Sequence, residues 1–594
     1  MAEAIGTAIG VVGLLGQLFD GCVKAYGYFS AAAGMDSDSA RLLCKVRIEE
    51  MRLVVWGREW GVAEGRLEAH LKGGGCNPQM AALAEGIMRE LHATVTDFQR
   101  LRERYGLVDG EGKERMVASG PGEKLKQETD RSWRREFSRR AKWVIADFND
   151  GLEQLFPPSR LPSLHRAWRH SLLDSAARDV AQLSLLESSS EDSYPQLGTS
   201  ANLKKLRINL DAKPQASFKP TFAFKVPRTD LELPSPEAVA TENSSGSNKS
   251  GKSNKSKSSS SNGGAKNDGS ETRTHATHRV HGPVLVEWVE YDPSDPEERF
   301  LHLRRLDDLA RMMHSASDRH PDLHTTDCVG YTDDKEHARY GLVYKCPRLP
   351  SPPPETTEVV AKGTEAATPA AETSHSTLFT LISSPDLKTP DLDDRVALAS
   401  TLACALWSLH SLDWLHKSLC SANILFFPSA VSAAATRDTA SAAVVPDVSR
   451  PYLVGFDASR PDMDAEVSVN PRNPSILDLH RDPRSLGVRS LTGEPEGERR
   501  GQYCKTYDIY SLGLVLLEIG LWKPLQTYYK PHYSAERWRD RVVMPVLVPG
   551  LGAKTGKVYK KVVERCLTAR DGMSSGEAGQ VMEWVVTTLE GIRT

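Results

Sequence analysis

Residues 415–427 read LHKSLCSANILFF, a polar loop that runs into an apolar strand. His416 and Asn423 are the two polar side chains that stand out in it. The preceding residues, LASTLACALWSLHS (398–411), carry apolar side chains at helical spacing, which predicts a buried helix. Two further apolar pieces follow, YLVGFDASR (452–460) and YDIYSLGLVLLEIGLW (507–522). The order helix, loop, strand, short strand and helix is the framework from which the fold of the second half is predicted.

The chain has 594 residues, so two or three folded units with linkers are expected. Its formal net charge of −3 gives no overall attraction to nucleic acid, and no nucleic-acid partner is expected. The nine cysteines form no C-x-x-C pair or Cys/His cluster. We therefore expect no metal site and no disulfide framework, which fits a reducing compartment and a cytoplasmic protein.

The first 210 residues predict an all-α helical bundle. Apolar side chains recur every three or four positions in the first segment, at Ile5, Ile9, Val12, Leu15 and Phe19. Further helices are predicted over 41–62, 80–106, 131–156 and 164–187. The apolar run 4–16 is too short to span a bilayer, which takes about 20 residues.

A change in composition marks a boundary after the bundle. The stretch SSGSNKSGKSNKSKSSSSNGGAKNDGS, within 235–275, contains one alanine and no larger apolar side chain, so residues 211–278 are predicted to be a flexible linker. Residues 279–594 mix strand and helix patterns. They predict an α+β unit of two lobes, a small one over about 279–347 and a large one over about 375–594, separated by a Pro-rich insert at 349–374.

The ordered pieces of this second half resemble a protein kinase domain. The 416–423 loop resembles H-R-D-x-x-x-x-N, GFD (455–457) stands where D-F-G is expected, and YDIYSLGLVLLE resembles D-x-W-S-x-G-x-x-L-x-E. The resemblance implies that Asp508 braces the backbone of the loop through hydrogen bonds. Lys417 stands at the arginine position of H-R-D and belongs, with His416, Ser418 and Asn423, to this degenerate loop.

The residues that carry phosphoryl transfer depart from this pattern. Ser418 stands at the catalytic aspartate, and its hydroxyl is too weak a base at neutral pH. Gly455 stands at the metal-binding aspartate, with Phe456 and Asp457 after it, and Asn423 alone would hold Mg²⁺ poorly. The strand VLVEWVEYD (284–292) has no lysine, and no Gly-rich loop precedes it. We therefore expect a pseudokinase, not an enzyme, that binds no Mg·ATP and needs no cofactor.

His416 and Asn423 also have a purely structural interpretation, and a second HRD triplet has to be considered. His416 can be a core histidine and Asn423 a turn-capping residue, without any nucleotide. The literal triplet His480-Arg481-Asp482 follows GFD instead of preceding it, and Gly487 stands where asparagine would be needed. That triplet is interpreted as part of the segment after GFD and not as a catalytic loop.

The N-terminal half resembles the HeLo domain of fungal prion-inhibition and propagation proteins. The residues that suggest this are the Gly-punctuated start AIGTAIGVVGLLGQLFDGCVKAYGYF, then RLLCKVRIEEMRLVVWGREWGV and AKWVIADFNDGLEQLF. The resemblance implies a cell-death effector of the heterokaryon-incompatibility type. Its first helix would leave the bundle and enter an anionic membrane through the face Ile5, Ile9, Val12, Leu15 and Phe19, so the protein would relocate from the cytoplasm to the plasma membrane. The glycines of this segment fit equally well with close packing inside a bundle.

Three functional hypotheses follow from the sequence. The first is an inactive kinase-like signalling protein whose helical half delivers the response, with a protein partner or self-association upstream. The second is an active or weakly active protein kinase that binds ATP through non-standard residues. The third is a passive interaction scaffold.

Overall fold

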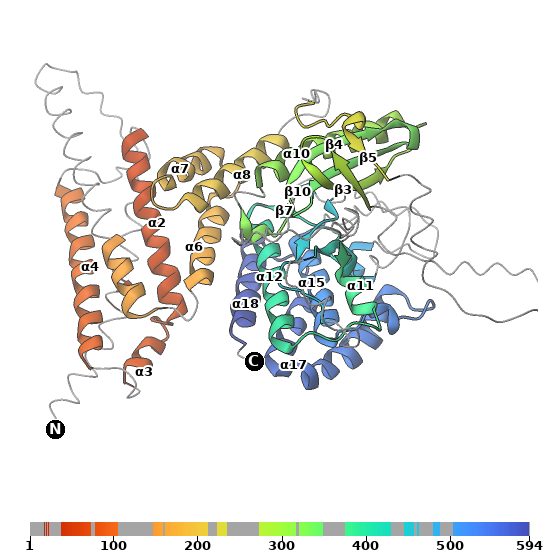
Figure 1. Cartoon of the computed structure of the whole chain (residues 1–594). Coiled ribbons are helices and arrows are strands. Elements are labelled where there is room, and N and C mark those ends of the chain that lie inside the picture. Colours follow the sequence, from red (N-terminus) through yellow and green to blue (C-terminus); the bar gives the residue numbers. More distant parts are fainter. Residues whose placement is uncertain are drawn as a thin grey trace, which may run out of the picture. The chain divides into compact units, whose positions relative to one another are not determined.

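The fold was analysed in a computed structural model of the whole chain. It describes residues 17, 19, 20, 22, 37–72, 78–104, 146–157, 161–211, 222–234, 273–316, 320–347, 375–428, 445–456, 460–461, 479–486 and 503–592. The described residues divide into two compact units, Met1–Lys205 and Leu206–Thr594. The first is helical, and the second combines a curled sheet with helices (Figure 1). The chain is therefore multidomain, with the boundary a few residues before the one predicted at 210.

The helical unit is built from long helices whose apolar faces meet. Its described helices are α2 (Ser37–Glu59), α3 (Arg66–Lys72), α4 (Pro78–Arg104), an unlabelled helix over 146–155, α6 (Leu161–Ala176), α7 (Val180–Ser190) and the first part of α8 (Pro195–Asp211). Trp56 and Trp168 are among its largest fully buried side chains. The indole N–H groups of Trp56 and Trp60 both donate to the carbonyl of Phe156, which ties α2 to the end of the 146–155 helix.

The prediction of one helix over 164–187 was wrong in detail. The chain breaks after α6, because Ala177 adopts a left-handed conformation with φ 46°. Asp179 then caps α7, since its carboxylate accepts hydrogen bonds from the backbone N–H groups of Ala181 and Gln182. Helix α8, which begins with a proline at its first turn, was not predicted from the sequence.

The second unit begins with a five-stranded antiparallel sheet. Its strands are β1 (Leu231–Glu232), β2 (Arg273–His278), β3 (Gly282–Glu290), β4 (Cys328–Asp334) and β5 (Arg339–Lys345), in the spatial order β1-β2-β3-β5-β4. Helix α10 (Pro296–Ala316) connects β3 to β4 and packs on β4 and β5. Both β1 and β2 come from the range predicted as linker, so the start of the folded unit at 279 falls inside this sheet.

The helical part of the second unit follows. It contains α11 (Leu378–Ser383), α12 (Leu392–Ser411), α15 (Lys505–Leu521), α16 (Ala535–Trp538), the π-helix η9 (Arg539–Leu547), α17 (Val548–Leu567) and α18 (Ser575–Glu590). Small sheets join β6 (Ser376–Thr377) with β8 (Ile424–Phe426) and β9 (Tyr452–Leu453), and β7 (Trp414–Leu415) with β10 (Arg460–Pro461). All residues of α15 are buried, so it is the central helix of this part.

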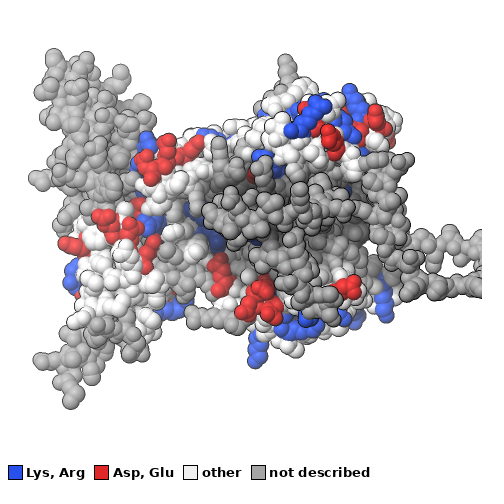
Figure 2. All heavy atoms as spheres, in the orientation of Figure 1, with Lys and Arg blue, Asp and Glu red and all other residues white. Residues whose placement is uncertain are grey.

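The described surface carries charges of both signs. On the face drawn in Figure 2, Lys and Arg side chains are interspersed with Asp and Glu. Among the described residues, no helix is both long enough and apolar enough to cross a bilayer.

Candidate functional site: the loop 416–423 and its polar partners

The centre of the loop is held by one buried carboxylate, Asp508 in the first turn of α15. Its oxygens accept hydrogen bonds from the backbone N–H groups of His416 (2.8 Å) and Lys417 (2.9 Å). They also accept from the Tyr503 hydroxyl (2.9 Å), and the ring Nε2 of His410 lies 3.2 Å away. Asp508 therefore has the backbone-bracing contacts that the sequence analysis assigned to it. Burial raises the pKa of the Tyr503 phenol, and the negative charge of Asp508 and the bond to it raise that pKa further.

The side chains of the loop itself are buried. The His416 ring packs against Phe456, with 4.8 Å between ring centroids, and burial lowers its pKa. Lys417 adopts φ 66°, and its amine lies 5.0 Å from the centre of the Tyr503 ring. The backbone N–H of Ser418 donates to Nδ1 of His416 (3.3 Å). These contacts bring His416, Lys417, Ser418 and Phe456 together around Asp508.

Asn423 closes the loop on itself. Its Nδ2 donates to the carbonyl of Ser418 (2.7 Å), and its backbone carbonyl accepts from the N–H of Val454 (3.1 Å). Gly455 follows with φ 83°, and a Cβ on it would lie only 2.3 Å from Asn423 Nδ2. A residue with a side chain would therefore be strained at position 455 and would also collide with Asn423.

Two residues that the sequence analysis did not select complete this site. Arg273, the first residue of β2, donates from Nε (2.9 Å) and Nη2 (2.8 Å) to Glu287 Oε1 on β3. Its Nη1 donates to the carbonyl of Ala422 (2.9 Å), and Nη2 also donates to Asn423 Oδ1. Glu287 Oε2 accepts from the N–H of Gly455 (3.2 Å). The side chains of Arg273 and Glu287 are 3% and 5% exposed, so the pair is fully desolvated.

A signal for one of these residues was present in the sequence. Glu287 is the acidic residue of VLVE (284–287), at the position where the V-A-I-K pattern has its lysine. Arg273 lies in the predicted linker, and only the pairing of β2 with β3 places it beside Glu287.

The other predicted residues are placed as follows. Asp457 lies outside the described residues, as do Ile5, Ile9, Val12 and Leu15. Phe19 is described and partly buried, and a Cβ built on Gly57 of α2 would lie 2.1 Å from its ring. The ring of Phe19 therefore packs directly over Gly57.

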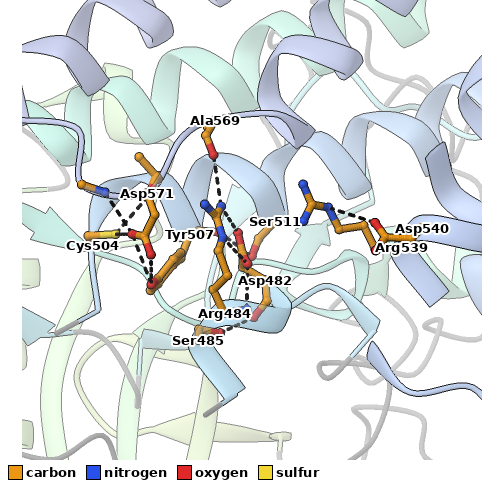
Figure 3. Close-up of polar contacts among 12 residues, drawn as sticks. Asp482, Arg484, Ser485, Cys504, Tyr507, Ser511, Arg539, Asp540, Ala569 and Asp571 are labelled. Atoms are coloured by element: carbon orange, nitrogen blue, oxygen red, sulfur yellow. Dashed lines mark hydrogen bonds and ion pairs between the residues drawn. The ribbon is translucent and has the colours of Figure 1, made fainter. Parts of the chain in front are cut away.

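Asp482, the last residue of the triplet 480–482, lies in a polar network with Arg484 (Figure 3). Asp482 accepts from the backbone N–H and the Nε of Arg484, both at 2.9 Å, and Arg484 also donates to the carbonyl of Ala569 after α17. His480 pairs with the buried Glu518 of α15 at 2.9 Å. These contacts hold the segment against α15 and against the chain after α17.

Comparison with known families identifies part of the helical unit. Residues 6–147 match the family HeLo, described as prion-inhibition and propagation. The HeLo domain is associated with fungal cell-death and incompatibility effectors. No curated protein matches the chain.

Proposed function

We propose that the chain is a catalytically inactive kinase-like signalling protein whose helical half is a cell-death effector. The support for the kinase-like part begins with the order of elements. In protein kinases a lysine on the third strand pairs with a glutamate on the following helix. The third strand here, β3, is followed by α10, and Glu287 stands at the lysine position. A negative side chain, Glu287, thus stands where the kinase pattern has a positive one, and Arg273 of β2 is the cation that pairs with it.

The observation that carries the inactive assignment is the internal pairing of the site. Asn423, the remaining candidate metal ligand, uses its Oδ1 for Arg273 and its Nδ2 for Ser418. A guanidinium at this place opposes a divalent cation by charge repulsion, and Gly455 offers no carboxylate. The residues present do not fit a magnesium–nucleotide complex. Binding one would require the Arg273–Glu287 pair to open inside a desolvated site.

The test is nucleotide binding and phosphoryl transfer by the full chain. We expect no rise in melting temperature with Mg·ATP beyond that with Mg²⁺ alone, and no γ-phosphate incorporation into the chain or a generic substrate. An active protein kinase run in parallel controls the assay. A saturable Mg·ATP shift that Asn423→Leu abolishes would show that this loop binds nucleotide, and would favour the alternative of a weakly active kinase.

The proposal for the helical half rests on the HeLo match and on the apolar spacing of residues 5–19. We propose that the protein is cytoplasmic at rest and that, after self-association or binding of a protein partner, this segment engages the anionic inner face of the plasma membrane. An apolar face that enters lipid tolerates no carboxylate at its centre. Ile9→Asp should therefore abolish killing of expressing cells and leakage of phosphatidylserine vesicles.

The matched control is Thr7→Asp, which adds the same charge two positions away and off the apolar spacing. It should retain most of the leakage and toxicity. Equal activity of the two variants would contradict an inserting face. A full chain that neither kills nor leaks vesicles would leave the passive scaffold as the better function.

A further inference from the structure

A short segment, residues 222–234, lies across the sheet of the second unit and is here called the strap. At its first end it runs parallel to the edge strand β4. The N–H of Val226 donates to the carbonyl of Tyr331 (2.8 Å), and the N–H of Tyr331 donates to the carbonyl of Phe224 (2.9 Å). At its other end the strap forms β1, which pairs with β2. One segment thus covers both edges of the sheet (Figure 1, the yellow stretch beside β4).

Between these ends the strap covers an apolar face. Side chains alternate between the two faces of a strand, so Val284, Val286 and Trp288 share the face opposite to Glu287. They form one cluster with Val343 of β5, and the strap adds Val226, Leu231 and Leu233 to it. Without the strap, this cluster would lose the apolar contacts of Val226, Leu231 and Leu233.

The fit between strap and sheet is specific at the β4 edge. A Cβ on Gly330 would lie 2.0 Å from the carbonyl oxygen of Phe224, so only glycine allows the strap to approach this closely. At the β2 edge, by contrast, the pair Glu232 and Thr277 is exposed on both strands. The edge of β4 therefore accommodates the backbone of the strap closely. The exposed pair Glu232 and Thr277 can be used to test whether the strap comes from the same molecule or from another.

The strap is attached with few bonds and long connections. Two backbone bonds join it to β4, β1 contributes two residues, and Asp230 accepts a backbone bond from Arg279 (3.1 Å). Residues 212–221 connect it to α8, and residues 235–272 connect it to β2. Fully extended, these connections would reach about 30 Å and more than about 100 Å, respectively. The covalent chain therefore allows the strap of one molecule to reach the sheet of a neighbouring molecule.

We propose that the strap is exchanged between copies of this chain, so that each copy covers the sheet of the other. The contacts made within one molecule and between two are the same, and only the effective concentration of the strap decides between them. Crowding of the copies favours exchange, because the long connection lowers the effective concentration of a molecule's own strap. The proposal concerns self-association, and its failure would leave the proposed function above intact.

The experiment uses the exposed register pair as a reporter. Full-length Glu232→Cys chains carrying one tag are mixed with full-length Thr277→Cys chains carrying another, concentrated, and oxidised. Exchange predicts a disulfide-linked species that carries both tags and increases with protein concentration. Each single variant oxidised alone controls for the native cysteines, and should give no comparable band.

The double variant Glu232→Cys/Thr277→Cys controls the fold and the geometry. In dilute solution it should close a disulfide within one chain, which shows that β1 and β2 pair as described. If the double variant closes while the mixture gives no two-tag species at any concentration, the proposal is overturned. A dimer detected by size alone, without the cross-chain disulfide, would also overturn it, because that dimer would form through another surface. Val226→Asp should reduce the two-tag species by removing an apolar contact of the strap.

Discussion

Each unit of this chain contains a buried arginine paired with a buried glutamate, and the two pairs differ in their surroundings. In the helical unit, Arg52 contacts Glu49 three residues earlier on α2, at 3.0 Å. In the second unit, Arg273 contacts Glu287 across two strands, at 2.8 Å. Both arginines are at most 5% exposed. The two pairs differ in the other hydrogen-bond partners of the arginine and the glutamate.

Arg52 lies in a network with several redundant partners. It also donates to the Tyr194 hydroxyl (2.7 Å) and to Asp150 (2.8 Å), whose side chain is 55% exposed. Glu49 in turn accepts from Tyr194 and from Asn149 Nδ2. Arg52 further pairs with Glu153 at 3.0 Å, a carboxylate that is 10% exposed and that also has His165 at 3.6 Å. If Arg52 is removed, each carboxylate of the network therefore keeps a second partner or, for Asp150, exposure to solvent.

Among the described residues, Arg273 and Glu287 have fewer alternative partners. Glu287 receives one further bond, from the N–H of Gly455, and the other acceptors of Arg273 are neutral oxygens of the 416–423 loop. A pair of this kind fixes the sheet to the loop in one arrangement. Two ion pairs that are equally buried can therefore lose different amounts of stability when their arginine is replaced. The loss depends on which hydrogen-bond donors remain for the glutamate.

The largest effect is expected for Arg273→Met. It leaves the Glu287 carboxylate desolvated with a single backbone donor, and should lower the free energy of unfolding of the second unit by about 3–5 kcal/mol. Chemical denaturation of the full chain, with hydrogen exchange to identify the unit, measures this. The double variant Arg273→Met/Glu287→Leu should recover most of the loss. A double variant as unstable as the single one would contradict the charge argument.

The next effect is expected for Gly455→Ala. The left-handed backbone costs about 1–3 kcal/mol for a residue with a side chain, and the overlap with Asn423 adds to it. Gly572 is the matched control, since it has φ 75° and a Cβ there would meet open space. The two alanine variants should differ in unfolding free energy by the overlap alone. Equal losses would show that the backbone relaxes around position 455.

Arg52→Met should cost less than Arg273→Met, about 1–3 kcal/mol, because Glu49 keeps two neutral donors. The measurement is the denaturation midpoint of the helical unit at neutral pH. Arg66→Met serves as a control, since Arg66 and Glu64 are more than 60% exposed and lie 3.7 Å apart. It should change stability by less than about 0.5 kcal/mol. A larger loss at Arg52 than at Arg273 would reverse the comparison.

The smallest effect is a difference in pH dependence. Burial lowers the pKa of His375 to about 3, so between pH 6.5 and about pH 3 the unfolded state takes up this proton more readily than the folded state. The second unit should lose stability as the pH falls from 6.5, by at most about 1.4 kcal/mol per pH unit. Burial raises the pKa of Glu50 to about 7, so between pH 7 and 4.5 the folded state takes up this proton first. The helical unit should therefore gain stability over that range.

Native-state hydrogen exchange between pH 7 and pH 5 measures both slopes in one sample, because each peptide reports on one unit. His375→Gln should flatten the slope of the second unit, and Glu50→Gln should flatten that of the helical unit. Slopes of the same sign in both units would contradict the assignment of these two groups.

Several elements could be predicted from local pattern. The helices α2, α4, α12 and α15 and the strand β3 lie where the sequence pattern placed them, with differences of several residues at some of their ends. The backbone contacts of Asp508 with the loop were expected from the resemblance of YDIYSLGLVLLE to a kinase motif. In each case the deciding signal lies within about twenty neighbouring residues.

The sequence by itself determined the helical character of the first unit and the mixed character of the second. Only the tertiary structure decided which charged residues meet at the 416–423 loop and which segment covers the sheet. The pairing of β2 with β3 brings Arg273 to Glu287. The strap covers an apolar face of the sheet, although the composition of the strap does not predict this. Both depend on contacts between strands, and such contacts are set by backbone pairing and burial at a distance along the chain. Local periodicity does not predict such contacts. The range 211–278, which resembles a linker in composition, therefore contains both Arg273 of the buried pair and the edge strand β1.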